Sequence, residues 1–263
     1  MRRLFSFLFL LGSLFSFSQS NFSYSLDAGV GGSFRGLYFA EDKLESVALP
    51  TGSNDGEALF NYIEEYLNER ESHQFAFSIN AIFHYQATPK LSLVSGIGYK
   101  NIGERFEDDE VLDLANWTGN FIPVYSGKLM IENLRYHYLA IPVEFRYELI
   151  EIQRILKGKV GLLGGMSFNF LLFDSFDKSA RYETMYKVIY GNPQNLALSA
   201  NVGLYYEHKL SNGSFIVFAP QISYFFTPNV KYKFGSNDSY IGVNQYNYSY
   251  EMKIGYRFNN LFN

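Results

Sequence analysis

The chain has 263 residues and a formal net charge of −4, from 22 lysine and arginine residues against 26 aspartate and glutamate residues. This acidic balance excludes nucleic acid as a partner held by electrostatic attraction. The absence of cysteine excludes disulfides, thiolate metal sites and lipoprotein acylation. Aromatic residues make up 19% of the chain, with 22 tyrosines, 26 phenylalanines and one tryptophan, so the sequence must place many rings on exposed or membrane-facing surfaces.

The N-terminal segment predicts export. Arg2 and Arg3 precede an apolar run that ends in small residues before Gln19, which is typical of a secretory signal peptide. We expect cleavage after Ser18, which divides the chain into a signal peptide, 1–18, and one β-barrel domain, 19–263. Removal of two arginines and no acid would take the formal charge from −4 to −6.

The rest of the chain alternates between apolar and polar residues in short segments. The segment 138–149 is the clearest example, because every second residue from Leu139 is apolar while the other face carries Glu144, Arg146 and Glu148. Eight such segments occur, at 22–32, 74–86, 91–100, 138–149, 160–170, 196–207, 216–226 and 246–258. No stretch after the signal peptide approaches the roughly 18 apolar residues of a membrane-spanning helix, so a membrane protein of this composition must be a β-barrel. A soluble β-sandwich is the alternative.

The connections between these segments alternate in length. Short connections at 87–90, 150–157 and 211–214 are interleaved with long ones, and 211–214 contains the Asn-Gly pair favoured in hairpins. An outer-membrane barrel with both termini in the periplasm requires this alternation, because its periplasmic turns are short and its outer loops long. We therefore predict an all-β fold, an eight-stranded antiparallel up-and-down transmembrane β-barrel, with a short helix in the first outer loop.

That helix is predicted from about 55 to 70. A capping-box spacing begins at Asn54, and four apolar residues follow at helical intervals. This stripe consists of Leu59, Ile63, Tyr66 and Leu67. The helix could pack on the barrel rim as a lid or bind a partner. The next long loop carries the acidic residues 107–110 and Asp113, for which a solvated surface is the simpler interpretation than a cation site.

Several motifs then show a family resemblance. They are Tyr-Leu-Ala-Ile-Pro-Val at 138–143, Ser-Gly-Ile-Gly-Tyr-Lys-Asn-Ile-Gly at 95–103, Val-Gly-Leu-Leu-Gly-Gly at 160–165 and the closing Lys-Ile-Gly-Tyr-Arg-Phe at 253–258. Together they resemble the PorT-like outer-membrane β-barrel family of the Bacteroidetes, over essentially the whole mature chain. The closing motif is similar to the C-terminal signal of outer-membrane proteins, although the chain continues through 259–263. The resemblance implies a place in the outer membrane and, for some relatives, a role in gliding or protein secretion.

Charged residues occur on the polar face of several predicted strands. An eight-stranded barrel has room inside only for side chains, so we expect these groups to pair across the lumen, with the charges of 138–149 facing those of 246–258. The predicted lumen network consists of Asp27, Glu144, Arg146, Glu148, Glu207, Glu251, Lys253 and Arg257. A proton or ligand path through these groups is the alternative.

The last predicted strand, 246–258, also carries aromatic residues on its apolar face, towards both of its ends. We expect Tyr246, Tyr248, Tyr256 and Phe258 to belong to the two aromatic girdles at the membrane interfaces, where amphipathic rings are favoured.

No catalytic or metal-binding pattern is present. The four histidines share no metal-ligand spacing and form no evident nucleophile pair, so we expect neither enzymatic activity nor a cofactor. Two functions remain open for a barrel that sits in outer-membrane lipid. The first is a protein whose long extracellular loops bind a protein partner, as part of a secretion or surface-protein assembly. The second is a small-ligand binder or narrow channel.

Overall fold

The computed structural model describes residues 22–43, 61, 64, 71–106, 131–152, 157–178, 192–235 and 240–258. Apart from Asn61 and Glu64, which are helical, the described residues form strands and the turns between them. No described helix is long and apolar enough to cross a membrane. The strands are β1 (Phe22–Lys43), β2 (Glu71–Ser72), β3 (Gln74–Gln86), β4 (Leu91–Phe106), β5 (Ile131–Ile152), β6 (Gly158–Lys178), β7 (Asn192–Pro193), β8 (Leu196–Lys209), β9 (Phe215–Phe225), β10 (Val230–Gly235) and β11 (Tyr240–Phe258).

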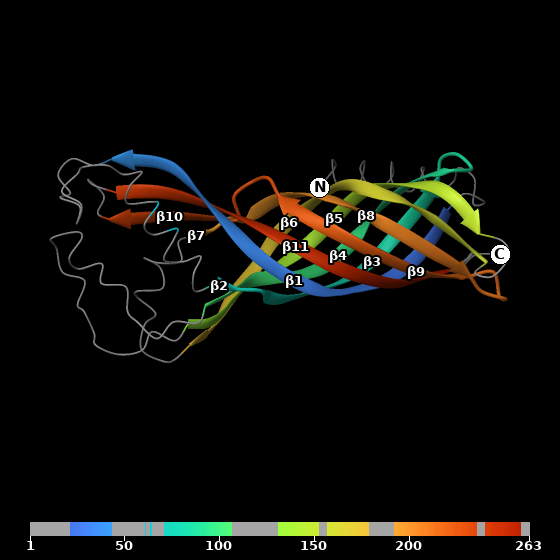
Figure 1. Cartoon of the computed structure of the whole chain (residues 1–263), viewed down its shortest axis with the longest axis horizontal. Helices are drawn as coiled ribbons and strands as arrows, with labels where there is room; N and C mark the ends of the chain where they lie inside the picture. Colours follow the sequence, from blue (N-terminus) through green and yellow to red (C-terminus); the bar gives the residue numbers. More distant parts are fainter. Residues whose placement is uncertain are drawn as a thin grey trace, which may run out of the picture.

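Eight long strands form a closed antiparallel ring (Figure 1). Its order is β1, β3, β4, β5, β6, β8, β9 and β11, and the ring closes because β11 pairs with β1 from Tyr24↔Phe258 to Lys43↔Tyr240. The predicted eight-stranded up-and-down barrel is therefore confirmed. The three short strands lie outside the ring, with β2 on β4, β10 on β11 and β7 on β10.

The two ends of the barrel differ. At one end, here called the turn end, lie the turns 87–90 and 211–214, the connection from β5 to β6, the start of β1 and the end of β11. The opposite end is here called the loop end. There β2, β7 and β10 lie towards the left of Figure 1.

The strands extend further towards the loop end than the sequence pattern predicts. Segment 22–32 becomes a strand to Lys43, and segment 138–149 begins at Ile131. Alternation fails at Phe39-Ala40-Glu41-Asp42, where the β1–β11 register shifts. From Leu134 to Tyr138 it continues with the opposite parity, because there the apolar residues are the buried ones, so the pattern of the lipid-facing segments did not extend to these residues. The short strands β2, β7 and β10 were not predicted either.

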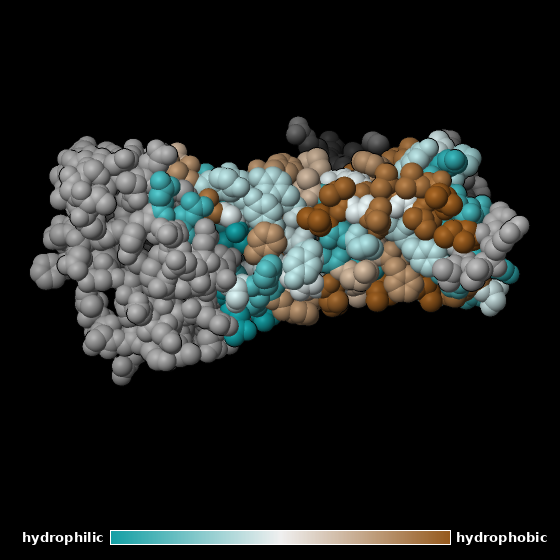
Figure 2. Space-filling view, in the orientation of Figure 1, coloured by the Kyte–Doolittle hydropathy of each residue, from teal (hydrophilic) through white to brown (hydrophobic). Residues whose placement is uncertain are grey.

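The outer surface of the ring is an apolar belt. Leu26, Val30, Ile79 and Ile254 are each more than half exposed, and equivalent apolar residues occur on every strand of the ring. Figure 2 shows brown, hydrophobic residues gathered over the half nearer the turn end and paler or teal residues towards the loop end. A closed ring without unpaired edges and with an apolar outer face is suited to lipid.

Three predicted features lie outside the described residues. They are the signal peptide at 1–18, the acidic loop residues 107–110 with Asp113, and the apolar stripe of the loop helix, Leu59, Ile63, Tyr66 and Leu67. All three stay predictions.

Candidate functional site in the barrel lumen

The alternate residues that do not face outward fill the lumen and are mostly polar. Contacts between strands that are not neighbours in the ring show how the lumen is filled, because such contacts must cross it. They fall at three levels between the turn end and the loop end.

Nearest the turn end, Arg146 on β5 lies between two carboxylates. Its Nη2 is 3.8 Å from Oδ2 of Asp27 on β1, and its Nη1 is 3.9 Å from Oε1 of Glu207 on β8. Arg257 on β11 donates a hydrogen bond of 2.8 Å to the same Glu207 oxygen. Two cations and two anions, each less than 15% exposed in its side chain, thus tie four strands together, and the mutual attraction offsets the desolvation of each charge.

At the middle level, Lys100 on β4 reaches across to β9 and β11. Its Nζ lies 3.4 Å from Oε1 of Glu251 and donates hydrogen bonds to Ser223, at 3.2 Å, and Ser249, at 3.1 Å. Ser78 donates to the other Glu251 oxygen at 3.0 Å. The Lys100 and Glu251 side chains are 8% and 1% exposed, so each is the main counter-charge of the other.

A chain of amides lies beside this pair. The side-chain amide of Asn201 donates to Glu144 at 3.3 Å and to Ser167 at 2.8 Å. Further along the same two strands, β6 and β8, Asn169 donates to Ser199 at 3.1 Å. Glu144 is therefore held by a neutral donor, and its ionic neighbours lie further away.

Towards the loop end, the lumen is closed by Glu104 and a group of rings. Glu104 accepts hydrogen bonds from the Tyr136 hydroxyl, at 2.9 Å, and from the Gln245 amide, at 2.8 Å. The Tyr138 and Phe225 rings, on β5 and β9, lie 6.1 Å apart between centroids. Tyr136, Tyr138 and Phe225 are all fully buried, so aromatic side chains fill the lumen at this level.

The structure corrects the predicted pairing of the lumen charges. The β5 charges do not pair directly with those of β11. Arg146 meets Asp27 and Glu207, while Glu148 accepts from the neighbouring Lys159 at 2.7 Å. Lys253 is partly exposed and has no ion pair among the described residues.

Strand tilt explains the difference. Along the register, Arg146 pairs with Leu163, Leu163 with Gly203, Gly203 with Gln221, and Gln221 with Glu251. Because hydrogen-bonded neighbours in a barrel lie on a line inclined to its axis, residues in register on distant strands lie at different depths. Counting residues from the strand ends therefore placed the β5 and β11 charges opposite one another, although they lie at different depths in the barrel.

Sequence reasoning missed two central residues of the network. Alternation places Lys100 on the inward face of the predicted strand 91–100, but the predicted network did not include it. Glu104 continues the same parity through Ile102, but it lies beyond the predicted end of that strand.

Of the four predicted girdle residues, Tyr256 and Phe258 lie at the end of β11, whereas Tyr246 and Tyr248 lie near its middle because the strand begins at Tyr240. All four are partly exposed. Towards the loop end, the Tyr248 ring stacks on Phe34, with centroids 5.1 Å apart and planes at 6°, and its hydroxyl lies 2.9 Å from that of Tyr38. Tyr246 packs edge-on against Tyr38. At the turn end, Tyr256 and Phe258 lie 4.8 Å apart. Their role at a membrane interface stays a prediction.

The lumen also contains one pair with the atoms of a nucleophile and a base. The Ser25 hydroxyl lies 2.9 Å from Nε2 of His84, and both residues are 2% exposed. The other ring nitrogen, Nδ1, has no hydrogen-bond partner in the described part of the chain, so no described acid orients the ring as in a hydrolase triad. Among the described residues no group of three or more histidine or acidic side chains could hold a metal ion.

A comparison with known protein families agrees with this architecture. A family model described as outer membrane protein beta-barrel domain matches residues 17–263. No curated protein matches the chain. Among solved structures, the chain is similar to OprG of Pseudomonas aeruginosa (10% identity, 92% of this chain and 98% of that one, TM-score 0.48) and to a major outer membrane protein of Thermus thermophilus (10% identity, 90% and 99%, TM-score 0.42). A third is Ail of Yersinia pestis in complex with a heparin analogue (11% identity, 90% and 99%, TM-score 0.38).

Proposed function

Since the chain belongs to the outer membrane protein beta-barrel domain family, and so resides in the outer membrane, we propose that it is a non-enzymatic barrel that binds a protein partner through its loop end. Such binding would fit a secretion or surface-protein assembly. Two features of the barrel support the proposal.

The first is the filled lumen. Contacts that cross it occur at each of the three levels: Arg146 with Asp27, Lys100 with Glu251, and Tyr138 with Phe225. Side chains that meet across an eight-stranded barrel fill much of its interior, which argues against bulk transport of solutes. Activity is then expected in the parts of the chain outside the lipid.

The second feature carries the proposal: four of the eight ring strands are about twice as long as a bilayer requires. A tilted strand crosses the hydrocarbon core in about 9 to 11 residues, whereas β1 and β5 have 22 residues each, β6 has 21 and β11 has 19. The apolar belt lies nearer the turn end (Figure 2), so the surplus length extends from the loop end. An ordered β-structure beyond the membrane provides a rigid platform for recognition.

A comparison of two single variants tests the proposal in native outer membranes. Phe39 on the β1 extension and Tyr85 near the turn end are both 39% exposed. We expect the wild-type protein and Tyr85→Ala to co-purify the same stoichiometric partner after cross-linking, and Phe39→Ala to lose most of it. Equal recovery with both variants, or no stoichiometric partner for the wild type, would refute partner binding at the loop end.

We retain the more specific PorT-like assignment as part of this proposal, because its support is the set of motifs at 95–103, 138–143, 160–165 and 253–258. The second function, a small-ligand binder or narrow channel, is favoured by one observation. Buried polar atoms of Asp27, Asn80 and Asn201 have no hydrogen-bond partner among the described residues, and such atoms are commonly satisfied by water or a polar ligand.

A further inference from the structure

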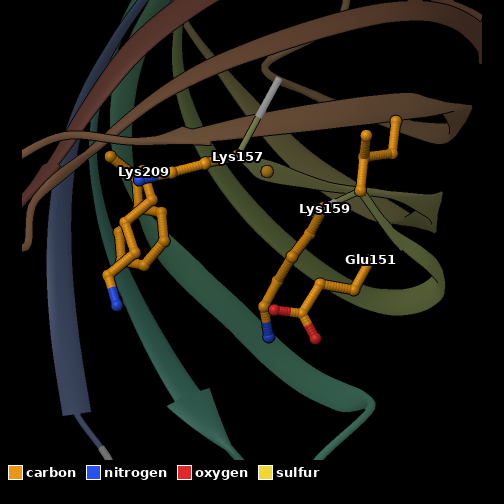
Figure 3. A pocket seen from close by; sticks show the side chains of 7 residues that line it. Glu151, Lys157, Lys159 and Lys209 are labelled. Carbon is orange, nitrogen blue, oxygen red and sulfur yellow. The ribbon is translucent and has the colours of Figure 1, made fainter. Parts of the chain in front are cut away.

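A pocket opens at the turn end of the lumen, between the end of β5 and the starts of β6 and β9 (Figure 3). Its volume is about 220 Å³, and it is lined by Glu151, Ile152, Lys157, Gly158, Lys159, Lys209 and Phe215. This volume is smaller than the 300 to 1,000 Å³ of typical drug-sized ligand sites. The pocket therefore fits a small ligand or the head of a larger one.

Strand register brings the lysines together. Gly158 pairs with His208, Lys159 with Glu207, and the Lys209 amide donates to the Lys157 carbonyl at 2.9 Å. A side chain at Gly158 would meet the Glu207 carbonyl oxygen at 2.4 Å and the Tyr206 ring at 2.7 Å. Glycine at this position thus allows β6 and β8 to approach closely at the pocket wall.

Two of the three lysines lack a counter-charge. Lys159 is held by Glu148 at 2.7 Å, and in Figure 3 it lies with Glu151 on one side of the pocket. Lys157 and Lys209 lie on the other side, are exposed, and form no ion pair with any described residue. The three lysines outnumber the two acidic residues, Glu148 and Glu151, so the pocket carries a net positive charge.

The surroundings are amphipathic. The ring of Phe215 and the side chain of Ile152 form apolar walls, and the outer face of the ring in the same stretch of β5 carries Leu149 and Ile150, which are 46% and 62% exposed. The pocket is thus better suited to an anion that carries apolar groups than to a small, fully hydrated carboxylate. Short turns of outer-membrane barrels face the periplasm, which places the pocket at the depth of inner-leaflet headgroups.

We propose that this pocket binds a phosphate group through Lys157 and Lys209. The adjoining apolar belt makes the headgroup of an anionic phospholipid the expected source, and inorganic phosphate is the other source of the same chemistry. A lysine near an anionic lipid surface contributes about 1 kcal/mol, or about a fivefold change in affinity. The site lies at the opposite end of the barrel from the proposed partner, so the two proposals stand or fall separately.

The test uses the full-length mature barrel and four proteins: wild type, Lys157→Gln with Lys209→Gln, Glu151→Gln, and Lys90→Gln. Lys90 is an exposed lysine of the turn 87–90, outside the pocket, so its variant controls for general loss of positive charge. Binding of phosphatidylglycerol is measured by native mass spectrometry from mixed bilayer discs. Binding of inorganic phosphate is measured by calorimetry in neutral detergent.

We expect phosphatidylglycerol retention by the wild type, roughly 25-fold weaker binding after loss of both lysines, and little change in Lys90→Gln. Glu151→Gln should strengthen binding, because it removes a negative charge from the pocket wall, and a merely misfolded variant would not do this. Phosphate binding with the same ranking but no lipid retention would support the site and assign the free anion as its ligand. Equal lipid retention by all four proteins, or no binding of either probe, would overturn the proposal.

Discussion

The ion pair between Lys100 and Glu251 gives the sharpest test of how the lumen stabilises the barrel. Replacing Lys100 by methionine removes the ammonium group but keeps most of the apolar stem. Glu251 would then retain the hydrogen bond from Ser78 but lose its counter-charge at 3.4 Å in a side chain only 1% exposed. Breaking a buried ion pair by removing one partner costs about 3 to 5 kcal/mol.

The matched double variant separates the lost pair from the buried charge. Lys100→Met with Glu251→Gln removes both charges, and the glutamine can still accept from Ser78, so we expect the double variant to regain at least about half of the loss. The free energy of unfolding is measured by urea titration in lipid vesicles, with the gel mobility of the folded barrel as the readout. A cost below about 1 kcal/mol for Lys100→Met, or no recovery in the double variant, would refute the argument that these two charges compensate each other.

Three further predictions concern the lipid face, the lumen and the aromatic residues. The Met252 side chain is 45% exposed on the outer face, so Met252→Arg should lower the free energy of unfolding in vesicles by about 2 to 4 kcal/mol. Ser211→Arg in the exposed turn should leave it unchanged. Equal tolerance of both variants would exclude a lipid-facing position for Met252. The wild-type protein should show no steady conductance in planar bilayers. The double variant Arg146→Ala with Lys253→Ala should be less stable and should leak, because Asp27 loses its counter-charge. Ion-selective conductance of the wild type would favour the channel alternative. Tyr248→Ala should lower the free energy of unfolding by at least about 1 kcal/mol more than Tyr248→Phe does, since only the phenylalanine keeps the stack on Phe34. Indistinguishable unfolding midpoints of the two variants would show that the stack contributes little.

The fold was predictable because a barrel in lipid imposes one rule on each strand. Where residues face lipid on one side and the lumen on the other, as from Leu139 to Leu149, alternation marks the strand and its inward residues. Beyond the belt this rule no longer applies: alternation is lost at Phe39 and Ala40 and changes parity from Leu134 to Tyr138, so the strand extensions were missed.

The lumen contacts were less predictable for a different reason. Parity identifies which residues point inward, as it did for Arg146, Glu207 and Glu251. It gives no information about depth, which depends on the tilt and stagger of the closed ring. The partners of Arg146 could therefore be found only from the three-dimensional register, and the same holds for the pocket beside Lys209, whose walls come from several strands.

The pairing of β1 with β11 has a consequence for how the protein reaches its final state. These two strands lie at opposite ends of the described chain, yet they share a continuous register from Tyr24↔Phe258 to Lys43↔Tyr240. Contacts of such large sequence separation form slowly, and until the seam closes both strands present unpaired edges that can recruit other chains. Every intermediate that lacks its last strand is thus exposed to aggregation, so safe assembly depends on keeping the two edges apart from other chains until they meet each other.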